Sequence, residues 1–137
     1  MPIDAQIRRD PDYLRVVYTG IVSVADVDFL ISGMERGDYP ANINRLHDFH
    51  DATDMVLPDQ TATSMSFRRR KTMDEASAGQ VRAAVLGANQ SIIEAMKVWR
   101  ATFYGDSTRY FMRICEDEAS ALDWIGAKAA PPAPVQQ

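Results

Sequence analysis

Short apolar segments alternate along the chain with longer segments in which apolar residues recur at helical spacing. Residues Ile3 to Arg8 and Tyr13 to Thr19 are short enough for strands, and the Asp-Pro pair between them favours a turn. In the second segment, alternate residues form an apolar side that is expected to be buried: Leu14, Val16 and Tyr18. The chain therefore opens with a predicted β-hairpin, which Gly20 is expected to end.

A helix is predicted from Ser23 to Gly37. Ser23 and Asp26 have the spacing with which a hydroxyl and a carboxylate satisfy free amides at a helix start, and Gly37 suits a left-handed end. The apolar residues of this segment recur at the spacing of one helix face: Val24, Val27, Leu30, Ile31 and Met34. One side of the helix is therefore expected to pack on the sheet.

The segment from Asn44 to Asp54 is predicted to hold the central strand, with Leu46, Asp48 and His50 on one side and His47, Phe49 and Asp51 on the other. The rest of the chain continues the alternation. It is predicted to contain a helix with a weak apolar face (Thr61 to Ala76), a buried strand (Val81 to Ala88), a strongly amphipathic helix (Ile92, Met96, Trp99, Phe103), a strand (Arg109 to Cys115) and a last helix from Asp117 to Gly126.

The order β-β-α-β-α-β-α-β-α predicts an α/β fold. Because strands that alternate with helices usually join through right-handed crossovers, we expect a single sheet of about five strands, mostly parallel, with an antiparallel hairpin at its N-terminal end. Helices should cover the sheet. One domain is expected over residues 1–126, and residues 127–137, rich in proline and alanine, are expected to form a disordered tail.

Composition limits the classes of function. The chain has 137 residues, 46% of them hydrophobic, and a formal net charge of -4, which disfavours nonspecific binding of nucleic acid. The first residues lack the pattern of a signal peptide, and no apolar run approaches the ~20 residues that span a bilayer. We therefore expect a soluble, cytoplasmic protein with no stable membrane insertion, and the single cysteine, Cys115, excludes an internal disulfide.

The C-terminal segment carries a resemblance to a known family. A strand containing Tyr110, Phe111, Met112 and Ile114 leads through Glu116-Asp117-Glu118 into a helix with the sequence Ala121-Leu122-Asp123-Trp124-Ile125. This ending, the element order from Tyr13 to Ile125 and an apolar strand that ends in Asp48 resemble the bacterial SpoIIAA-like proteins, which are related to STAS and SEC14-like domains.

The resemblance implies a small α/β domain that binds a partner protein, as anti-sigma-factor antagonists do, or an apolar, lipid-like ligand, as the SEC14 relationship suggests. Antagonists of that kind carry an Asp-Ser-Ser-Gly-type phosphorylation motif between the strand and the second helix. This chain has Thr53-Asp54-Met55-Val56-Leu57-Pro58-Asp59 there instead, so Thr53 is only a nearby candidate hydroxyl. The resemblance implies no catalytic residues.

Both histidines lie in the central strand among acidic residues. His47, Asp48, His50 and Asp51 are of the types that bind metals or move protons. Strand alternation places two on each face, fewer than the three protein ligands of a usual catalytic zinc site. We therefore prefer the interpretation that these polar groups satisfy one another, and we predict no cofactor.

Arg68-Arg69-Arg70-Lys71 is a dense positive run. Four consecutive helical residues sweep all faces, so at least one of them should lie toward the sheet or a neighbouring molecule. The run is either a solvated face or a site for an anionic headgroup, phosphate or acidic partner. Met65, Trp99 and Phe103 are expected core residues, and the alternative is that they line an apolar binding surface.

Three functions follow in order of preference. The first is a non-catalytic regulatory module that binds a protein partner or itself, as a homodimer, through the second helix and its basic run. The second is a carrier of a lipid-like or other apolar anionic small molecule, held between the second and third helices near the basic run. The third is a small metal-dependent enzyme built on the histidines and aspartates of the central strand. An exposed apolar patch would favour the first function, and an enclosed pocket the second.

Overall fold

The computed structural model describes residues 3–8, 12–40, 42–75, 80–101 and 110–126. These residues form five strands and four helices in the predicted order. The elements are β1 (Ile3–Arg8), β2 (Tyr13–Val22), α1 (Val24–Arg36), β3 (Arg45–Met55), α2 (Asp59–Glu75), β4 (Val81–Leu86), α3 (Gln90–Ala101), β5 (Tyr110–Ile114) and α4 (Glu118–Gly126).

All five strands form one sheet in the order β1-β2-β3-β4-β5. β1 pairs with β2 in the antiparallel direction, and the other three pairings are parallel. The predicted α/β class, mixed sheet and N-terminal hairpin are therefore confirmed. β3 lies at the centre, where Arg45 pairs with Ala83 of β4 and His47 pairs with Val85.

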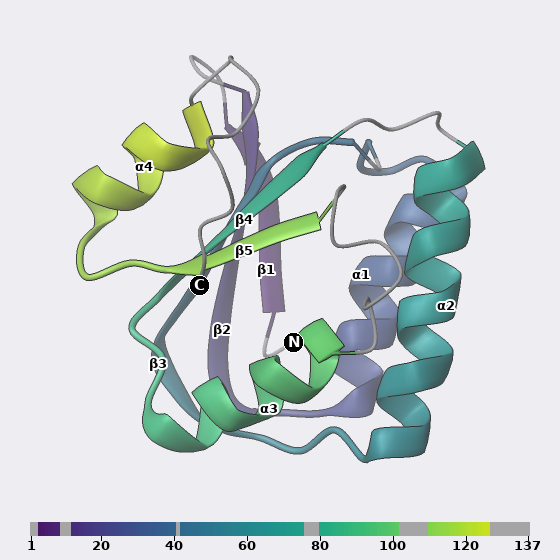
Figure 1. Cartoon of the computed structure of the whole chain (residues 1–137), viewed down its shortest axis with the longest axis horizontal. Helices are drawn as coiled ribbons and strands as arrows, with labels where there is room; N and C mark the ends of the chain where they lie inside the picture. The colour runs from purple at the N-terminus through teal and green to yellow at the C-terminus, as the bar shows by residue number, and fades with distance from the viewer. Residues whose placement is uncertain (1–2, 9–11, 41, 76–79, 102–109, 127–137) are drawn as a thin grey trace.

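The sheet separates two unequal layers of helices (Figure 1). α1, α2 and α3 lie on one side and α4 on the other. The larger apolar cluster joins the first side of the sheet to the three helices and contains Leu14, Val16, Tyr18, Leu30, Phe49, Met73, Ile92 and Met96. The smaller cluster lies under α4 and contains Tyr13, Leu46, Ala84, Leu86, Ala121 and Ile125. Alternation along β2 therefore assigns side chains to the two layers as predicted. In β3 it holds only as far as Phe49, because Ala52 and Met55 also lie in the larger cluster and Asp51 is exposed.

The predicted helix starts form as the spacing indicates. At α1, the backbone N–H and the hydroxyl of Ser23 both donate to the carboxylate of Asp26, at 2.8 and 3.1 Å. Gly37 ends that helix in the left-handed conformation, at φ 86°. At α4, Asp117 accepts a 2.8 Å hydrogen bond from the backbone N–H of Ser120. These local contacts fix where the connections leave the sheet.

The expected end of the second strand at Gly20 is wrong. β2 continues through Gly20 to Val22, and its pairing with β3 shifts register on both sides of that position. Gly20 has a φ of 67°, so the glycine allows a bulge within the strand rather than a break. As a result β2 and β3 run alongside each other as far as the Val22–Met55 pair. The predicted disordered tail at 127–137 lies outside the described residues.

Candidate functional site

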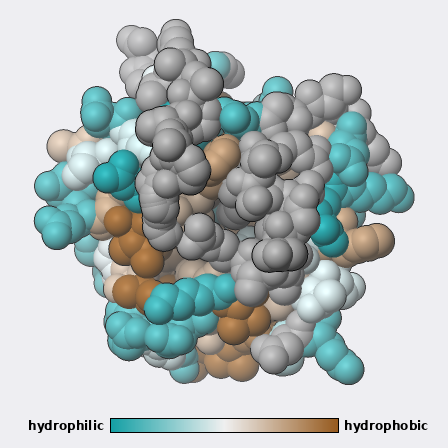
Figure 2. All heavy atoms as spheres, viewed as in Figure 1, coloured by the Kyte–Doolittle hydropathy of each residue, from teal (hydrophilic) through white to brown (hydrophobic). Residues whose placement is uncertain are grey.

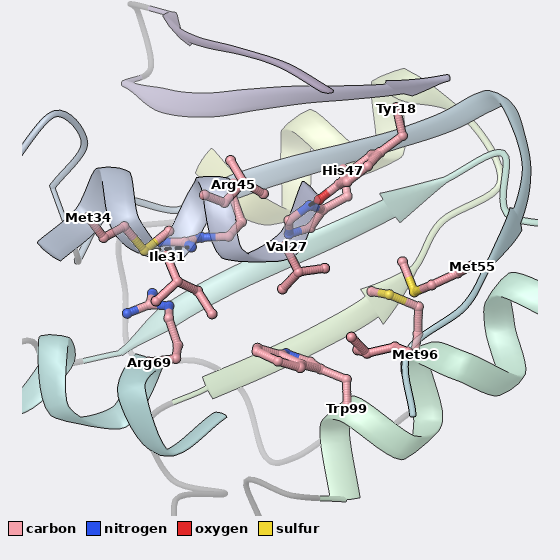
Figure 3. A pocket seen from close by; sticks show the side chains of 12 residues that line it. Tyr18, Val27, Ile31, Met34, Arg45, His47, Met55, Arg69, Met96 and Trp99 are labelled. Atoms are coloured by element: carbon pink, nitrogen blue, oxygen red, sulfur yellow. Dashed lines mark hydrogen bonds between the residues drawn. The ribbon is translucent and has the colours of Figure 1, made fainter. Parts of the chain in front are cut away.

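A pocket of about 60 Å³ lies between the sheet and the three-helix layer. The twelve lining residues come from two strands, three helices and the turn after β3: Tyr18, Val27, Leu30, Ile31, Met34, Arg45, His47, Met55, Leu57, Arg69, Met96 and Trp99 (Figure 3). Most of them are apolar. Pockets of this composition, with a few polar groups that converge on an apolar space, are the usual form of a small-molecule site.

The sheet contributes a buried row of rings. The hydroxyl of Tyr18 and Nδ1 of His47 are 2.8 Å apart and hydrogen-bonded. The ring of Tyr18 stacks on Phe49 with centroids 4.2 Å apart. Tyr18, His47 and Phe49 are all less than 9% exposed, because inward positions of neighbouring strands β2 and β3 bring them together.

Two arginines lie deep in the same pocket. Arg45, at the start of β3, is 3% exposed, and Arg69, in the middle of α2, is 2% exposed. Arg45 donates through Nη2 to the carbonyl of Ile43 at 2.9 Å, and its Nη1 lies 3.8 Å from the sulfur of Met34. Arg69 donates through Nη1 to the hydroxyl of Thr72 at 3.2 Å. Burying a guanidinium group is unfavourable unless its surroundings compensate for the lost water, so two in one pocket are unusual.

The surroundings of the pocket change the pKa of His47. Burial, followed by the positive charges of Arg45 and Arg69, lowers the pKa of His47 to about 3. His47 is therefore neutral at physiological pH. None of the twelve lining residues, all of them in the described part of the chain, is acidic. The charged side chains among these lining residues are therefore the two arginines, which are the groups of the pocket that can bind an anion.

The basic run of α2 divides into separate roles. Arg68 bridges to α1, donating to Asp28 at 2.6 Å and to Glu35 at 2.7 Å, and this hydrogen bonding lowers the pKa of Glu35. Arg69 points into the pocket, as Figure 3 shows. Arg70 lies over the ring of Phe67, with 5.4 Å to its centroid, and Lys71 is exposed. The expectation that one of the four faces the sheet is fulfilled by Arg69.

The histidine and aspartate cluster is split by the sheet. His47 faces the pocket, whereas Asp48 lies on the α4 side and accepts hydrogen bonds from Nδ1 of His50 at 2.7 Å and from Arg15 at 2.9 Å. Burial opposes ionisation of Asp48, but hydrogen bonds from His50 and the charges of His50 and Arg15 hold its pKa below the ordinary value. Asp51 is exposed. Within the described ranges, no three side chains of His, Cys, Asp or Glu come together as a metal site.

The other candidate residues are dispersed. Met65 is 4% exposed and is not among the residues that line the pocket, whereas Trp99 lines it. Phe103 lies outside the described residues. Thr53 is exposed, and its carbonyl accepts a 2.9 Å hydrogen bond from Asn89. Of the predicted ligand-binding residues, the pocket therefore brings together Arg69 and Trp99.

Sequence reasoning missed Arg45 and Tyr18 and placed His47 only in a metal site. It also treated α1 as core alone, although Val27, Leu30, Ile31 and Met34 of α1 line the pocket. One signal was available. Arg45 has the same strand parity as His47 and Phe49, so alternation places an arginine on a face that is otherwise to be buried.

These features define the class of fold, and a solved structure agrees with it. The chain resembles an uncharacterised protein of the DUF3478 family with a SpoIIAA-like fold from Shewanella loihica PV-4, with 19% sequence identity and a TM-score of 0.51. The match covers 90% of this chain and 91% of that one. The domain therefore has a SpoIIAA-like α/β fold, as the sequence resemblance predicts. No protein-family model and no curated protein matches the chain.

Among the residues that the structure describes, no helix combines the length and the apolarity that crossing a membrane requires.

Proposed function

We propose that this domain is a non-catalytic binding module that holds an apolar, anionic small molecule in the pocket under α1, α2 and α3. The observation that carries the proposal is the burial of two guanidinium groups, those of Arg45 and Arg69, in a largely apolar pocket. An apolar body would displace water from the lining, and a negative group would meet the guanidinium groups. The resemblance to SpoIIAA-like proteins supports the same class of function.

The pocket moves the small-molecule function ahead of the protein-interaction function. The sequence places the ligand between the second and third helices, near the basic run. Arg69 of α2 and Trp99 of α3 do line the pocket, and α1 and the sheet supply its remaining walls. The pocket is partly open and mostly apolar, which favours the carrier. On the face drawn in Figure 2, hydrophobic residues lie in small separate groups among hydrophilic ones.

The two tryptophans allow a direct test. Trp99 lines the pocket, whereas Trp124 lies in the layer of α4 on the other side of the sheet, with Arg82 5.5 Å from its ring centroid. In Trp124→Phe protein, an apolar anion such as an alkyl carboxylate should change the fluorescence of Trp99 in a saturable manner. In Trp99→Phe protein, the emission of Trp124 should stay constant. Saturable changes of equal size at both tryptophans, or at neither, would contradict binding in this pocket.

Protein interaction is kept as a second candidate because of Phe67. This side chain is 68% exposed on α2 and has Arg70 above its ring, an arrangement common in protein interfaces. If α2 mediates self-association, Phe67→Ser should lower the mass measured by sedimentation at high concentration to that of the monomer. If the unaltered protein is monomeric at all concentrations, the homodimer hypothesis is contradicted.

A further inference from the structure

The identity of the ligand can be narrowed, on the basis of the proposed function. We infer that the ligand is a small monocarboxylate, bound with its carboxylate between Arg45 and Arg69 and with its apolar body toward Met55, Met96 and Trp99. The inference rests on how charge, shape and size are distributed along the pocket.

One end of the pocket is cationic. Figure 3 shows the side chains of Arg45 and Arg69 entering from opposite walls, one from β3 and one from α2, with Met34 and Ile31 beside them. Both residues line the same pocket, and the positive charge of each contributes to the lowered pKa of His47. Two guanidinium groups that converge from opposite walls form the arrangement that clamps a carboxylate.

The other end of the pocket is apolar. Met55, Met96 and Trp99 come from the end of β3 and from α3, and Figure 3 shows them grouped away from the two arginines. Met96 is 7% exposed and Met55 is 9% exposed, so a ligand there would be removed from water. Flexible thioethers adjust to an apolar body of variable shape, and they make favourable contacts with rings.

The lining favours a single negative charge on a planar group. Desolvation penalties rise steeply with charge, so a monoanion loses less hydration free energy than a phosphate dianion when it enters this mostly apolar lining. A planar carboxylate also matches the fork of a guanidinium, which offers two parallel donors. The neutral His47 and the hydroxyl of Tyr18 add no opposing charge.

The volume of the pocket indicates the size of the ligand. A pocket of 60 Å³ holds roughly four to six water-sized groups, at ~10–15 Å³ for each. This accommodates a carboxylate on a short chain or a small ring, whereas the rest of a long acyl chain would extend beyond the buried part of the pocket. The short ligand distinguishes this inference from the broader expectation of a lipid-like molecule.

The test is calorimetric titration of the unaltered protein with matched compounds. Pentanoate should bind, whereas pentanamide and pentylammonium, which keep the apolar body, should bind roughly tenfold or more weakly because the charge-assisted hydrogen bonds are lost. Pentyl phosphate tests the dianion, and decanoate tests the length. Both should bind more weakly than pentanoate.

Variants locate the head of the ligand. Arg69→Gln should weaken pentanoate binding by roughly tenfold and leave pentanamide unchanged. Arg70→Gln, one residue along α2 and outside the pocket lining, is the matched control and should leave both unchanged. Circular dichroism would confirm that each variant is folded, and Arg45→Gln repeats the test from the opposite wall.

The outcomes distinguish a failure of the carboxylate inference from a failure of the proposed binding function. If pentanamide binds as well as pentanoate, the pocket is a binding site but the carboxylate inference is overturned. If pentyl phosphate or decanoate binds more tightly than pentanoate, the charge or the size assigned here is wrong. If no compound in the series binds, the inference fails, and the tryptophan experiment decides independently whether the proposed function fails with it.

Discussion

Tyr18 and His47 are joined across neighbouring strands by a 2.8 Å hydrogen bond that lies on the wall of the pocket. Each residue is less than 9% exposed. Because the imidazole is neutral, one ring nitrogen accepts and the other donates, and the Tyr18 hydroxyl helps to decide which tautomer is present. This pair therefore couples the polar chemistry of the pocket to the packing of β2 on β3.

Removing the hydroxyl of Tyr18 should destabilise the fold. Tyr18→Phe leaves Nδ1 of a buried His47 without this hydrogen bond, so the free energy of unfolding in urea should fall by about 1–3 kcal/mol. A double-mutant cycle with His47→Gln isolates the pair, because loss of a real interaction makes the two changes non-additive. Additive effects would show that the hydroxyl stabilises the protein through other contacts.

The depressed pKa of His47 predicts how stability depends on pH. The pKa is about 3 in the folded protein, against an ordinary value of 6.5 that should apply to the unfolded chain. Between these values the unfolded chain binds the extra proton, so stability decreases as pH falls, by at most about 1.4 kcal/mol per pH unit. Above pH 6.5 this group contributes no slope.

Denaturation in urea at several pH values between 6.5 and 5 measures that slope. This range lies above the ordinary pKa values of carboxylic acids, which would otherwise contribute. His47→Gln should flatten the dependence, and His50→Gln, which leaves the pocket histidine in place, should retain it. An unchanged slope in His47→Gln would mean that the histidine is not held neutral by the fold.

Gly87 and Gly20 provide a matched pair for the effect of close packing. Both have a positive φ, of 70° and 67°. A Cβ at Gly87 would lie 2.7 Å from the ring of His50 and 2.8 Å from its backbone nitrogen, whereas a Cβ at Gly20 would meet nothing within 4 Å. Gly20→Ala should therefore show only the backbone strain, about 1 kcal/mol, and Gly87→Ala should cost more. Thermal unfolding of the two variants measures the difference, and equal losses would disprove the close approach.

Asn44 should contribute more to the free energy of unfolding than an ordinary surface asparagine does. Its side chain accepts from the backbone N–H of Arg82 at 2.9 Å and donates to the carbonyl of Ile125 at 2.7 Å, and so ties the start of β3 to β4 and to α4. Asn44→Ala should reduce the free energy of unfolding by about 2 kcal/mol, since two partly buried backbone groups lose their partners. Asn89→Ala removes a cap at α3, where Asn89 accepts from Ile92 at 3.0 Å, and an exposed 2.9 Å hydrogen bond to the carbonyl of Thr53. It should cost about 1 kcal/mol, because the exposed carbonyl can bond to water instead. A loss at Asn44 no larger than that at Asn89 would contradict this role.

The fold was largely predictable because local patterns and tertiary packing agree. Alternation in β2 places Leu14, Val16 and Tyr18 in the large cluster, and the helical spacing of Ile92 and Met96 places both side chains there too. Gly20 was misjudged because a glycine can either end a strand or allow a bulge, and only pairing with β3 decides which.

The pocket was less predictable because its polar residues come from segments far apart in the sequence. Helical geometry predicts that one residue of the basic run points inward, but it does not specify Arg69. Arg45 is a charged residue at the start of a strand, where exposure is the usual outcome, and its burial depends on α1 packing above it. Only tertiary structure places Arg45, Arg69 and His47 around one space.

The two sides of the sheet carry different features: the pocket lies on the three-helix side, and the contacts that hold α4 lie on the other side. Arg45, Arg69 and Trp99 belong to the three-helix side, whereas Asn44, Arg82 and Trp124 link the strands to α4 on the other. Substitutions that reshape the pocket can therefore leave the hydrogen bonds that anchor α4 unchanged. The shape of the pocket and the attachment of α4 can thus change independently of each other.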